Sequence, residues 1–401
     1  MSQLLSTDPQ FAVPPESIGP VCEEHPPAGG LAFRWISSVD ELEEILPQWI
    51  DLADHAVWRN AMFEHSFLIP ALKFLNKGNV RVLVVESHDP MPVRGGTQLV
   101  ALLPVVKKRF YHLPVSCLEV WKHDQCFDTT PLIRKTGARQ TLDSILDFFS
   151  WQKIGLLSLD TVSAEPEFQA VLNDAIARKG RSLFHRDSFI RSALRPEHDS
   201  DEYLRKFVSK NLRKKNRRLA RRLCRLGKVT CELSSEFSDY EALTQQFLEI
   251  ESCGWKAKTG TALNCHPHTR YFYEELISRS AQYGNARFLS LKLDGNPVIM
   301  LSDIQSGKKV FSFKTGYDER FAAFSPGLQI EMKNIQSLHD SGIELVDSCM
   351  QPGNTHLNRT WGQTLHFQSA VIGLRPGMPS LATQLMPWIQ SAANQFKRIR
   401  S

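Results

Sequence analysis

The sequence has no C-x-x-C pair, no long apolar run and no start typical of a secreted protein. Its eight cysteines are scattered along the chain, which argues against a disulfide framework and fits a reducing compartment. The apolar run LVALLPVV at 99–106 is far shorter than the roughly 20 residues that a membrane-spanning helix needs. The N-terminus lacks a basic start followed by an apolar core. We therefore expect a cytoplasmic protein with no transmembrane segment.

The composition is that of an ordinary globular protein, with 42% hydrophobic and 23% charged residues. At 401 residues the chain exceeds the usual size of one domain, so we expect two domains or one duplicated fold. Residues 1–30 are rich in proline and glycine with few apolar residues, which predicts a mobile leader. The net charge of +5 says little about partners, because its largest basic block lies in one helix-like segment.

Hydrophobic periodicity predicts alternating helices and strands in both halves of the chain. In the first half, a capped amphipathic helix is expected from about Val39, followed by two strands at 79–87 and 97–110. Near residue 200 the pattern restarts with one long basic helix at 201–228. The elements expected after it are a strand at 229–234, helices at 238–253 and 269–284, strands at 286–295, 296–305 and 308–317, a helix at 327–342 and a strand at 343–348. Turn residues make the three central strands a meander, and the mixture predicts an α/β (α+β) fold.

The two halves also echo each other in sequence. LVALLPVV leads after about thirty residues into FDTTPLI, and PVIMLSDI leads after a similar distance into AFSPGLQI. A duplication would explain why the pattern restarts near residue 200. The halves differ after the shared proline, where Leu132 stands in the first half and Gly327 in the second.

The stretch Ser325-Pro326-Gly327 has the residues of a helix start. Serine is a good N-cap, proline suits the first helical position, and glycine allows a ligand to approach the backbone. Free amides and the positive end of a helix dipole form a natural phosphate site. The plain alternative is that these residues only start a helix.

Four segments together resemble the CelD-like, FemAB-related acetyltransferase domain of the GNAT superfamily. They are NLRKKNRRLARRLCRLGKV, LDGNPVIMLSDIQSGKKVFSF, KTGYDERFAAFSPG and LVDSCMQPGNTHLNRTWG. The resemblance covers roughly residues 200–365 and is fainter in the first half. It implies tandem GNAT-like halves with mixed β-sheets flanked by helices, at 31–195 and 196–375, followed by a helical tail at 376–401. It also implies that acetyl-CoA or another acyl-CoA meets an amine acceptor at a split in the sheet.

The resemblance assigns roles to individual residues. It implies that the donor is bound by the helix start and its neighbours, namely Ser325, Pro326, Gly327, Leu328 and Lys314. Trp255 and Lys256 stand at the position of a Trp-Lys pair common in the family, and they could line the acceptor cleft or simply anchor their loop. Asp318, Arg359 and Trp361 are the other residues predicted to contact the acceptor. The family usually has a Tyr-Lys pair after its strand-end aspartate, whereas this chain reads Thr355-His356-Leu357-Asn358 there.

Acyl transfer to an amine needs a base for the nucleophile and an acid for the leaving thiolate. Asp347, which falls at the family's strand-end aspartate, could take the proton directly or through water, and His356 is the other candidate base. Tyr317 could bind the donor or protonate the thiolate. The alternatives are that Asp347 caps or pairs structurally, that Tyr317 only packs, and that the enzyme works by positioning without a base.

The basic segment at 204–228 has no acidic residue and carries an apolar stripe. It could bind nucleic acid, anionic lipid or an acidic carrier protein, or it could be a packed helix with a solvated face. Nucleic acid is not expected, because no base-reading module accompanies it. The cluster CHPH at 265–268 has metal-ligand residue types but no second pair, so no metal is expected.

Three functions stay open at this stage. The first is N-acyl transfer from acyl-CoA to a small-molecule or glycan-precursor amine, such as an exopolysaccharide or cell-envelope precursor, which the CelD-like resemblance implies. The second uses an acyl-carrier protein or aminoacyl-tRNA as donor. The third is a degenerate fold that binds an anionic partner.

Overall fold

The computed structural model describes residues 30–87, 97–109, 115–196, 199–235, 237–350 and 356–375. The helical tail predicted at 376–401, and all of the predicted leader except Gly30, lie outside these residues.

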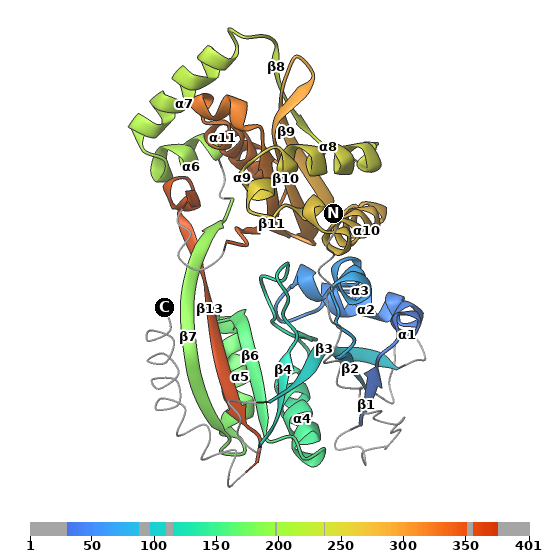
Figure 1. The fold of residues 1–401 in the computed structure, drawn as a ribbon. Coiled ribbons are helices and arrows are strands. Elements are labelled where there is room, and N and C mark those ends of the chain that lie inside the picture. Colours follow the sequence, from blue (N-terminus) through green and yellow to red (C-terminus); the bar gives the residue numbers. More distant parts are fainter. Residues whose placement is uncertain are drawn as a thin grey trace, which may run out of the picture.

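One mixed sheet of 13 strands runs through both halves of the molecule (Figure 1). Its strand order is β1-β2-β3-β4-β6-β13-β7-β12-β11-β10-β9-β8, with β5 beside β3. The strands of the first half are β1 (Leu31–Ile36), β2 (Val80–Ser87), β3 (Gln98–Arg109), β4 (Ser116–Val120), β5 (Leu132–Ile133), β6 (Leu156–Ser163) and β7 (Ser182–Leu194). Those of the second half are β8 (Val229–Leu233), β9 (Ala286–Leu293), β10 (Asn296–Ser306), β11 (Lys309–Tyr317), β12 (Leu345–Asp347) and β13 (Gln363–Gly373). The predicted α/β class with two helix-flanked halves is confirmed.

The first half begins as the sequence predicts. The helix expected from Val39 forms, because Ser38 caps it by accepting a hydrogen bond from the amide of Asp40 (3.1 Å). It is divided at Ile45 into two helices. The helices of this half are α1 (Val39–Glu44), α2 (Leu46–Asp54), α3 (His65–Phe74), α4 (Ala138–Trp151) and α5 (Pro166–Ala177), with the 3₁₀ turn η1 (Ala61–Phe63).

The second half contains α6 (Ser200–Phe207), α7 (Lys210–Leu223), α8 (Tyr240–Ser252), α9 (Trp255–Lys258), α10 (Pro267–Gln282) and α11 (Pro326–His339), with the 3₁₀ turns η2 (Leu263–Cys265), η3 (Glu319–Phe324) and η4 (His356–Arg359). The prediction of a single long basic helix at 201–228 is wrong. Val208 is extended, and the Ser209 hydroxyl accepts from the amide of Leu212 (3.2 Å), so a second helix starts there.

The predicted meander is confirmed: β9, β10 and β11 pair as consecutive antiparallel neighbours. From β11 the chain passes through η3 and α11 to β12, which pairs with β11 in parallel. The first half repeats this order, because β4 leads through α4 to β6 and these two strands are also parallel. The two strand–helix–strand units support the predicted duplication.

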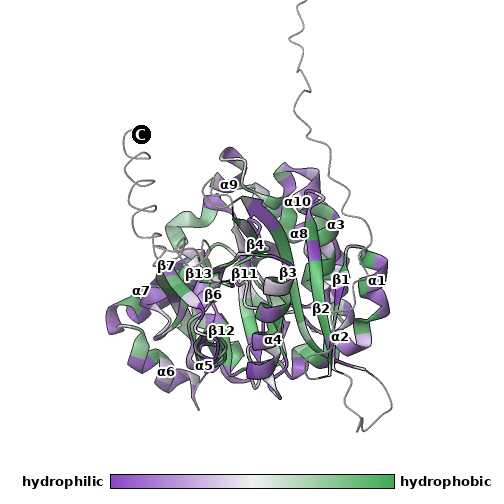
Figure 2. Ribbon diagram, turned by 90° about the horizontal axis from the view of Figure 1, so that it is seen from below, coloured by the Kyte–Doolittle hydropathy of each residue, from purple (hydrophilic) through white to green (hydrophobic). Residues whose placement is uncertain are grey.

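The last described strand crosses back into the first half. β13 pairs along its length with β7 and also pairs with β6, and β7 pairs in turn with β12 (Figure 1). The long strands β7 and β13 therefore join the two halves into one sheet. Hydrophobic residues follow the central strands, whereas α7 is strongly hydrophilic (Figure 2).

Helices cover both faces of the second half. Phe247 and Leu248 of α8 and Phe272 of α10 belong to one core cluster with Phe288 and Met300. On the other face, Ile330 of α11 and Leu223 of α7 share a cluster with residues of β9 and β10. The segment that links β11 to β12 therefore lies on the opposite face from α8 and α10.

Candidate active site

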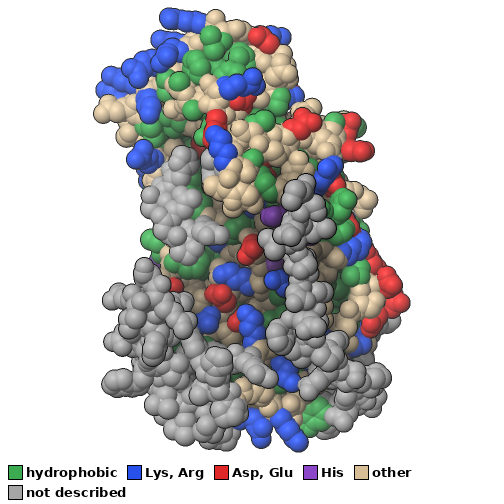
Figure 3. Space-filling view, in the orientation of Figure 1, with side chains coloured by type: hydrophobic (Ala, Val, Ile, Leu, Met, Phe, Trp, Pro, Cys, Tyr) green, Lys and Arg blue, Asp and Glu red, His purple; other side chains and the backbone are tan. Residues whose placement is uncertain are grey.

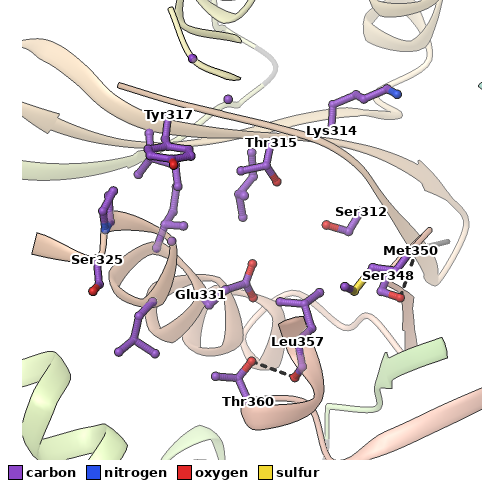
Figure 4. A pocket seen from close by; sticks show the side chains of 18 of the residues that line it. Ser312, Lys314, Thr315, Tyr317, Ser325, Glu331, Ser348, Met350, Leu357 and Thr360 are labelled. Carbon is purple, nitrogen blue, oxygen red and sulfur yellow. Dashed lines mark hydrogen bonds between the residues drawn. The ribbon is translucent and has the colours of Figure 1, made fainter. Parts of the chain in front are cut away.

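A split in the sheet lies between β11 and β12. Their pairing ends where Phe311 meets Asp347, and β11 continues to Tyr317 without a further partner on that side among the described residues. A cavity of about 1130 Å³ occupies this region and is lined by residues 312–317 of β11 and by the first turns of α11 (Figure 4). The structure therefore has a cavity at a split in the sheet, and the family resemblance implies that donor and acceptor meet at such a split.

The start of α11 forms one end of the cavity. Ser325 occupies the N-cap position, as predicted, but its side chain makes no capping hydrogen bond, because its backbone is left-handed (φ 49°, ψ 60°). Its carbonyl accepts instead from the amides of Leu328 (3.1 Å) and Gln329 (3.3 Å). The amide of Gly327 has no acceptor within the described part of the chain. Ser325, Pro326, Gly327 and Leu328 all line the cavity, so one free amide and a helix dipole are available to an anion.

Two exposed basic side chains line the cavity. They are Lys215 of α7 and Arg359 of η4. Lys215 belongs to an exposed basic surface on and just after α7, formed by Lys210, Lys214, Lys215, Arg217, Arg218, Arg221, Arg222, Arg225 and Lys228. None of these nine cations has an ion pair with a described residue, and Figure 3 shows Lys and Arg side chains gathered over α7.

Glu331 of α11 is a candidate catalytic residue that the sequence analysis missed. It lines the cavity, is only 7% exposed and points between α11 and β11 (Figure 4). Burial raises its pKa from 4.5 to about 7, although the hydrogen bond that it accepts from Trp361 Nε1 (3.1 Å) acts in the opposite direction. A carboxyl group that titrates near neutrality inside a cavity is suited to general acid–base chemistry.

The other face of β11 has its own polar groups. Lys314 and Lys256, both partly buried, and Glu251, which is buried, line the cavity there. Lys256 Nζ donates to Glu251 Oε1 and to the carbonyl of Thr315, each at 2.8 Å. Burial lowers the pKa of Lys314 to about 8, while Glu251 raises it and Lys256 lowers it further. The cavity therefore reaches both faces of the strand.

Asp347 lies at the end of β12, as predicted, but it does not line the cavity. It is fully buried, and its Oδ2 is 2.6 Å from Nη2 of Arg191, which comes from β7. Its Oδ1 accepts from the amide of Cys349 (3.0 Å). These contacts favour the structural alternative, in which Asp347 pairs rather than accepts a proton from a substrate.

Tyr317 and Asp318 are adjacent in the sequence but lie in different surroundings. Tyr317 lines the cavity and packs in the cluster that contains Ile330. Asp318 lies outside the cavity, where its carboxylate caps η3 and pairs with Arg320 (2.6 Å), whose hydrogen bonds lower the pKa of Asp318. Asp318 therefore has a structural explanation that needs no acceptor.

The remaining predicted residues are only partly described. His356 begins η4 and Trp255 begins α9, but their side chains are outside the described part, as is all of Thr355. Trp361 is 4% exposed and reaches the cavity only through Glu331. No group of three metal-ligating side chains occurs among the described residues, which include the CHPH cluster. No helix within them is long and apolar enough to cross a membrane.

Comparison with known proteins agrees with this geometry. Residues 210–356 match the family described as acetyltransferase (GNAT) domain. The fold is similar to the crystal structure of FemX, with a TM-score of 0.54 and 11% identity, over 82% of this chain and 95% of that one. It is also similar to the C-terminal domain of a putative lysylphosphatidylglycerol synthetase from Agrobacterium fabrum, with a TM-score of 0.50 and 12% identity, over 85% and 95% of the two chains. No curated protein matches the chain. Residues 210–356 are therefore similar to a GNAT acetyltransferase domain, and the fold is similar to those of the two solved structures.

Proposed function

We propose that the protein is an N-acyltransferase that moves an acyl group from acetyl-CoA or another acyl-CoA to an amine. The observation that carries the proposal is the cavity at the β11–β12 split, which has a helix start at one end and a buried carboxyl group, Glu331, inside it. The helix start suits the binding of an anionic donor, and the carboxyl group can act as a proton acceptor.

The donor side fits CoA. The free amide of Gly327 and the exposed ammonium of Lys215 would hold its phosphates, with Pro326, Leu328 and Ser325 shaping the entrance. CoA would supply an activated thioester. The volume of about 1130 Å³ is large enough for a cofactor and part of an acceptor.

Glu331 is the base that we propose. It would accept the proton from the acceptor nitrogen as the new C–N bond forms and the thioester C–S bond breaks. Tyr317, whose hydroxyl has no hydrogen-bond partner among the described residues, would donate its proton to the leaving thiolate. It would regain a proton from solvent, to which Glu331 releases the proton that it took. His356 stays a second candidate base. We do not propose Asp347 as the base, because its carboxylate forms a buried ion pair with Arg191.

On the acceptor side, we propose contacts with Trp255, Lys256 and Arg359, and a positioning role for Trp361, which holds Glu331. The CelD-like resemblance supports an exopolysaccharide or cell-envelope precursor as the acceptor.

The exposed basic surface of α7 favours one alternative donor. The surface has nine cations that form no ion pair with a described residue, and one of them, Lys215, lines the cavity. They exceed what the phosphates of one CoA need and would suit an acyl-carrier protein with an acidic surface. Aminoacyl-tRNA as donor, or a degenerate fold that binds an anionic partner, would use the same surface.

Calorimetric titration with acetyl-CoA tests the proposal. We expect binding by the wild type and at least about tenfold weaker binding by Gly327→Val, because the valine side chain blocks approach to the amide. Lys333→Val is the matched control, because Lys333 is an exposed residue of the same helix that does not line the cavity. Equal affinities for all three folded proteins would show that the donor site is elsewhere, and no binding by the wild type would remove CoA as the donor.

A further inference from the structure

Lys314 does not share a side of β11 with the donor end of the cavity. Lys314 pairs with Ser302, whose hydroxyl accepts from Tyr273 of α10 (2.7 Å). Thr315 pairs with Leu301, which packs with Ile330 of α11. Directly paired residues in a ladder point to the same face. Lys314 therefore points away from α11, as Figure 4 shows.

A β-bulge produces this orientation. Between its pairs with Ile304 and Ser302, β11 has two residues where β10 has one, so the alternation of its side chains shifts by one residue. Without the bulge, Lys314 would face α11 together with Ser312, on the side of the donor residues with which the sequence analysis grouped it.

The Lys314 ammonium has no acceptor among the described residues. It lies over the rings of Phe313 (4.9 Å) and Phe127 (5.4 Å), the latter from the first half of the chain. Glu251 is the carboxylate that raises the pKa of Lys314 most. Its two oxygens, however, accept hydrogen bonds from Lys256 Nζ (2.8 Å) and from the amide of Leu263 (2.9 Å). Aromatic faces alone compensate only part of the cost of removing a cation from water.

The fully buried cations among the described residues have carboxylate partners. Arg191 pairs with Asp347 and Arg287 with Asp303, each at 2.6 Å, and Lys309 lies 4.0 Å from Asp128 Oδ2. Lys314 differs because it lines a cavity, where a ligand can provide the missing anion.

We propose that Lys314 binds a carboxylate or phosphate group of the acceptor, so that the acceptor is an amine that carries a negative charge. This inference rests on the proposed function. The phosphates of the donor do not account for Lys314, because the helix start that would bind them lies on the other face of β11. Because Phe127 packs near the Lys314 ammonium, the first half of the chain would contribute a residue to this acceptor site.

The test measures anion binding at Lys314 without turnover. Lys314 is labelled briefly with acetic anhydride and quantified by mass spectrometry, with and without inorganic phosphate or acetate. We expect at least one anion to slow labelling of Lys314 by about threefold or more, in the wild type and equally in Gly327→Val. Protection by phosphate alone or by acetate alone identifies the group that the site prefers. No protection by either anion overturns the inference.

Two variants complete the test. Lys314→Met removes the charge at similar length, and we expect the melting temperature to stay equal or rise, because a partly buried cation without a carboxylate partner is lost. If phosphate protects Lys314 from labelling, phosphate-dependent line broadening in ³¹P NMR should be smaller in Lys314→Met than in the wild type and in Lys314→Arg, with the remainder coming from the donor end; equal broadening in all three proteins would then contradict the inference. Acetyl-CoA binding without anion binding at Lys314 would refute the inference alone, whereas anion binding without acetyl-CoA binding would refute the proposed function and leave an anion site.

Discussion

Replacement of Glu331 by glutamine tests the chemistry that we assign to the cavity. Glutamine keeps the length of the side chain and an oxygen that can accept the hydrogen bond from Trp361 Nε1, but it cannot take a proton. General-base assistance typically contributes about 10² to 10⁴ in rate, and we expect a loss of that size. The affinity for acetyl-CoA should change little, because the proposed phosphate contacts lie at Gly327 and Lys215.

The raised pKa of Glu331 gives the reaction a specific pH dependence. The base acts only when deprotonated, so the rate should rise as the pH increases through about 7. With that pKa, about 9% of the carboxyl group is ionised at pH 6 and about 91% at pH 8, a roughly tenfold rise in rate. With the ordinary value of 4.5, the group would already be almost fully ionised at pH 6 and the profile would be nearly flat.

Two assays measure these effects. Thiol release from acetyl-CoA is followed with a panel of amino acids, amino sugars and polyamines between about pH 5.5 and 8.5. Infrared difference spectra between the wild type and Glu331→Gln report the ionisation of the carboxyl group directly and need no acceptor. Turnover of Glu331→Gln within about threefold of the wild type with an unchanged pH profile, or a carboxyl group that titrates near its ordinary pKa, would refute the reasoning.

Four further outcomes follow from the same contacts. Asp347→Asn should lower the free energy of unfolding by about 3–5 kcal/mol in urea titrations, because it leaves the buried guanidinium of Arg191 uncompensated; wild-type stability with lost turnover would return Asp347 to catalysis. Trp361→Phe removes a hydrogen bond that lowers the pKa of Glu331, so the rising limb of the pH–rate profile should move to higher pH, and an unmoved limb would contradict this role. His356→Gln should keep near-normal single-turnover rates, and a collapse confined to this variant would move the base to its loop. Fluorescence anisotropy should show feeble binding of nucleic acid to α7 at physiological salt, whereas tight binding that weakens steeply with salt would favour the non-enzymatic alternative.

Local signals explain what the sequence could predict. Turn residues fixed the meander of β9, β10 and β11, and Pro326 marked the start of α11. The basic segment was predicted as one helix rather than two, because its apolar stripe continues across Ser209 and gives no sign that Ser209 is the N-cap of a second helix. Periodicity reports which side of a helix is apolar, but it does not report where a polar residue on that side is buried, so Glu331 went unnoticed.

Contacts between distant segments explain what the sequence could not predict. Arg191 and Asp347 are 156 residues apart, and nothing local marks them as a pair. The position of β13 between β6 and β7 likewise depends on pairing across the two halves. The orientation of Lys314 depends on a single extra residue in β11, and a one-residue shift moves a side chain to the other face of a sheet.

The most direct test of the account is a crystal structure of the protein bound to CoA. The account predicts phosphate density at the amide of Gly327 and the ammonium of Lys215, with the thiol end in the split between β11 and β12, near Glu331. CoA bound outside this cavity, or with its thiol end away from the split, would contradict the assignment of this cavity as the site of acyl transfer.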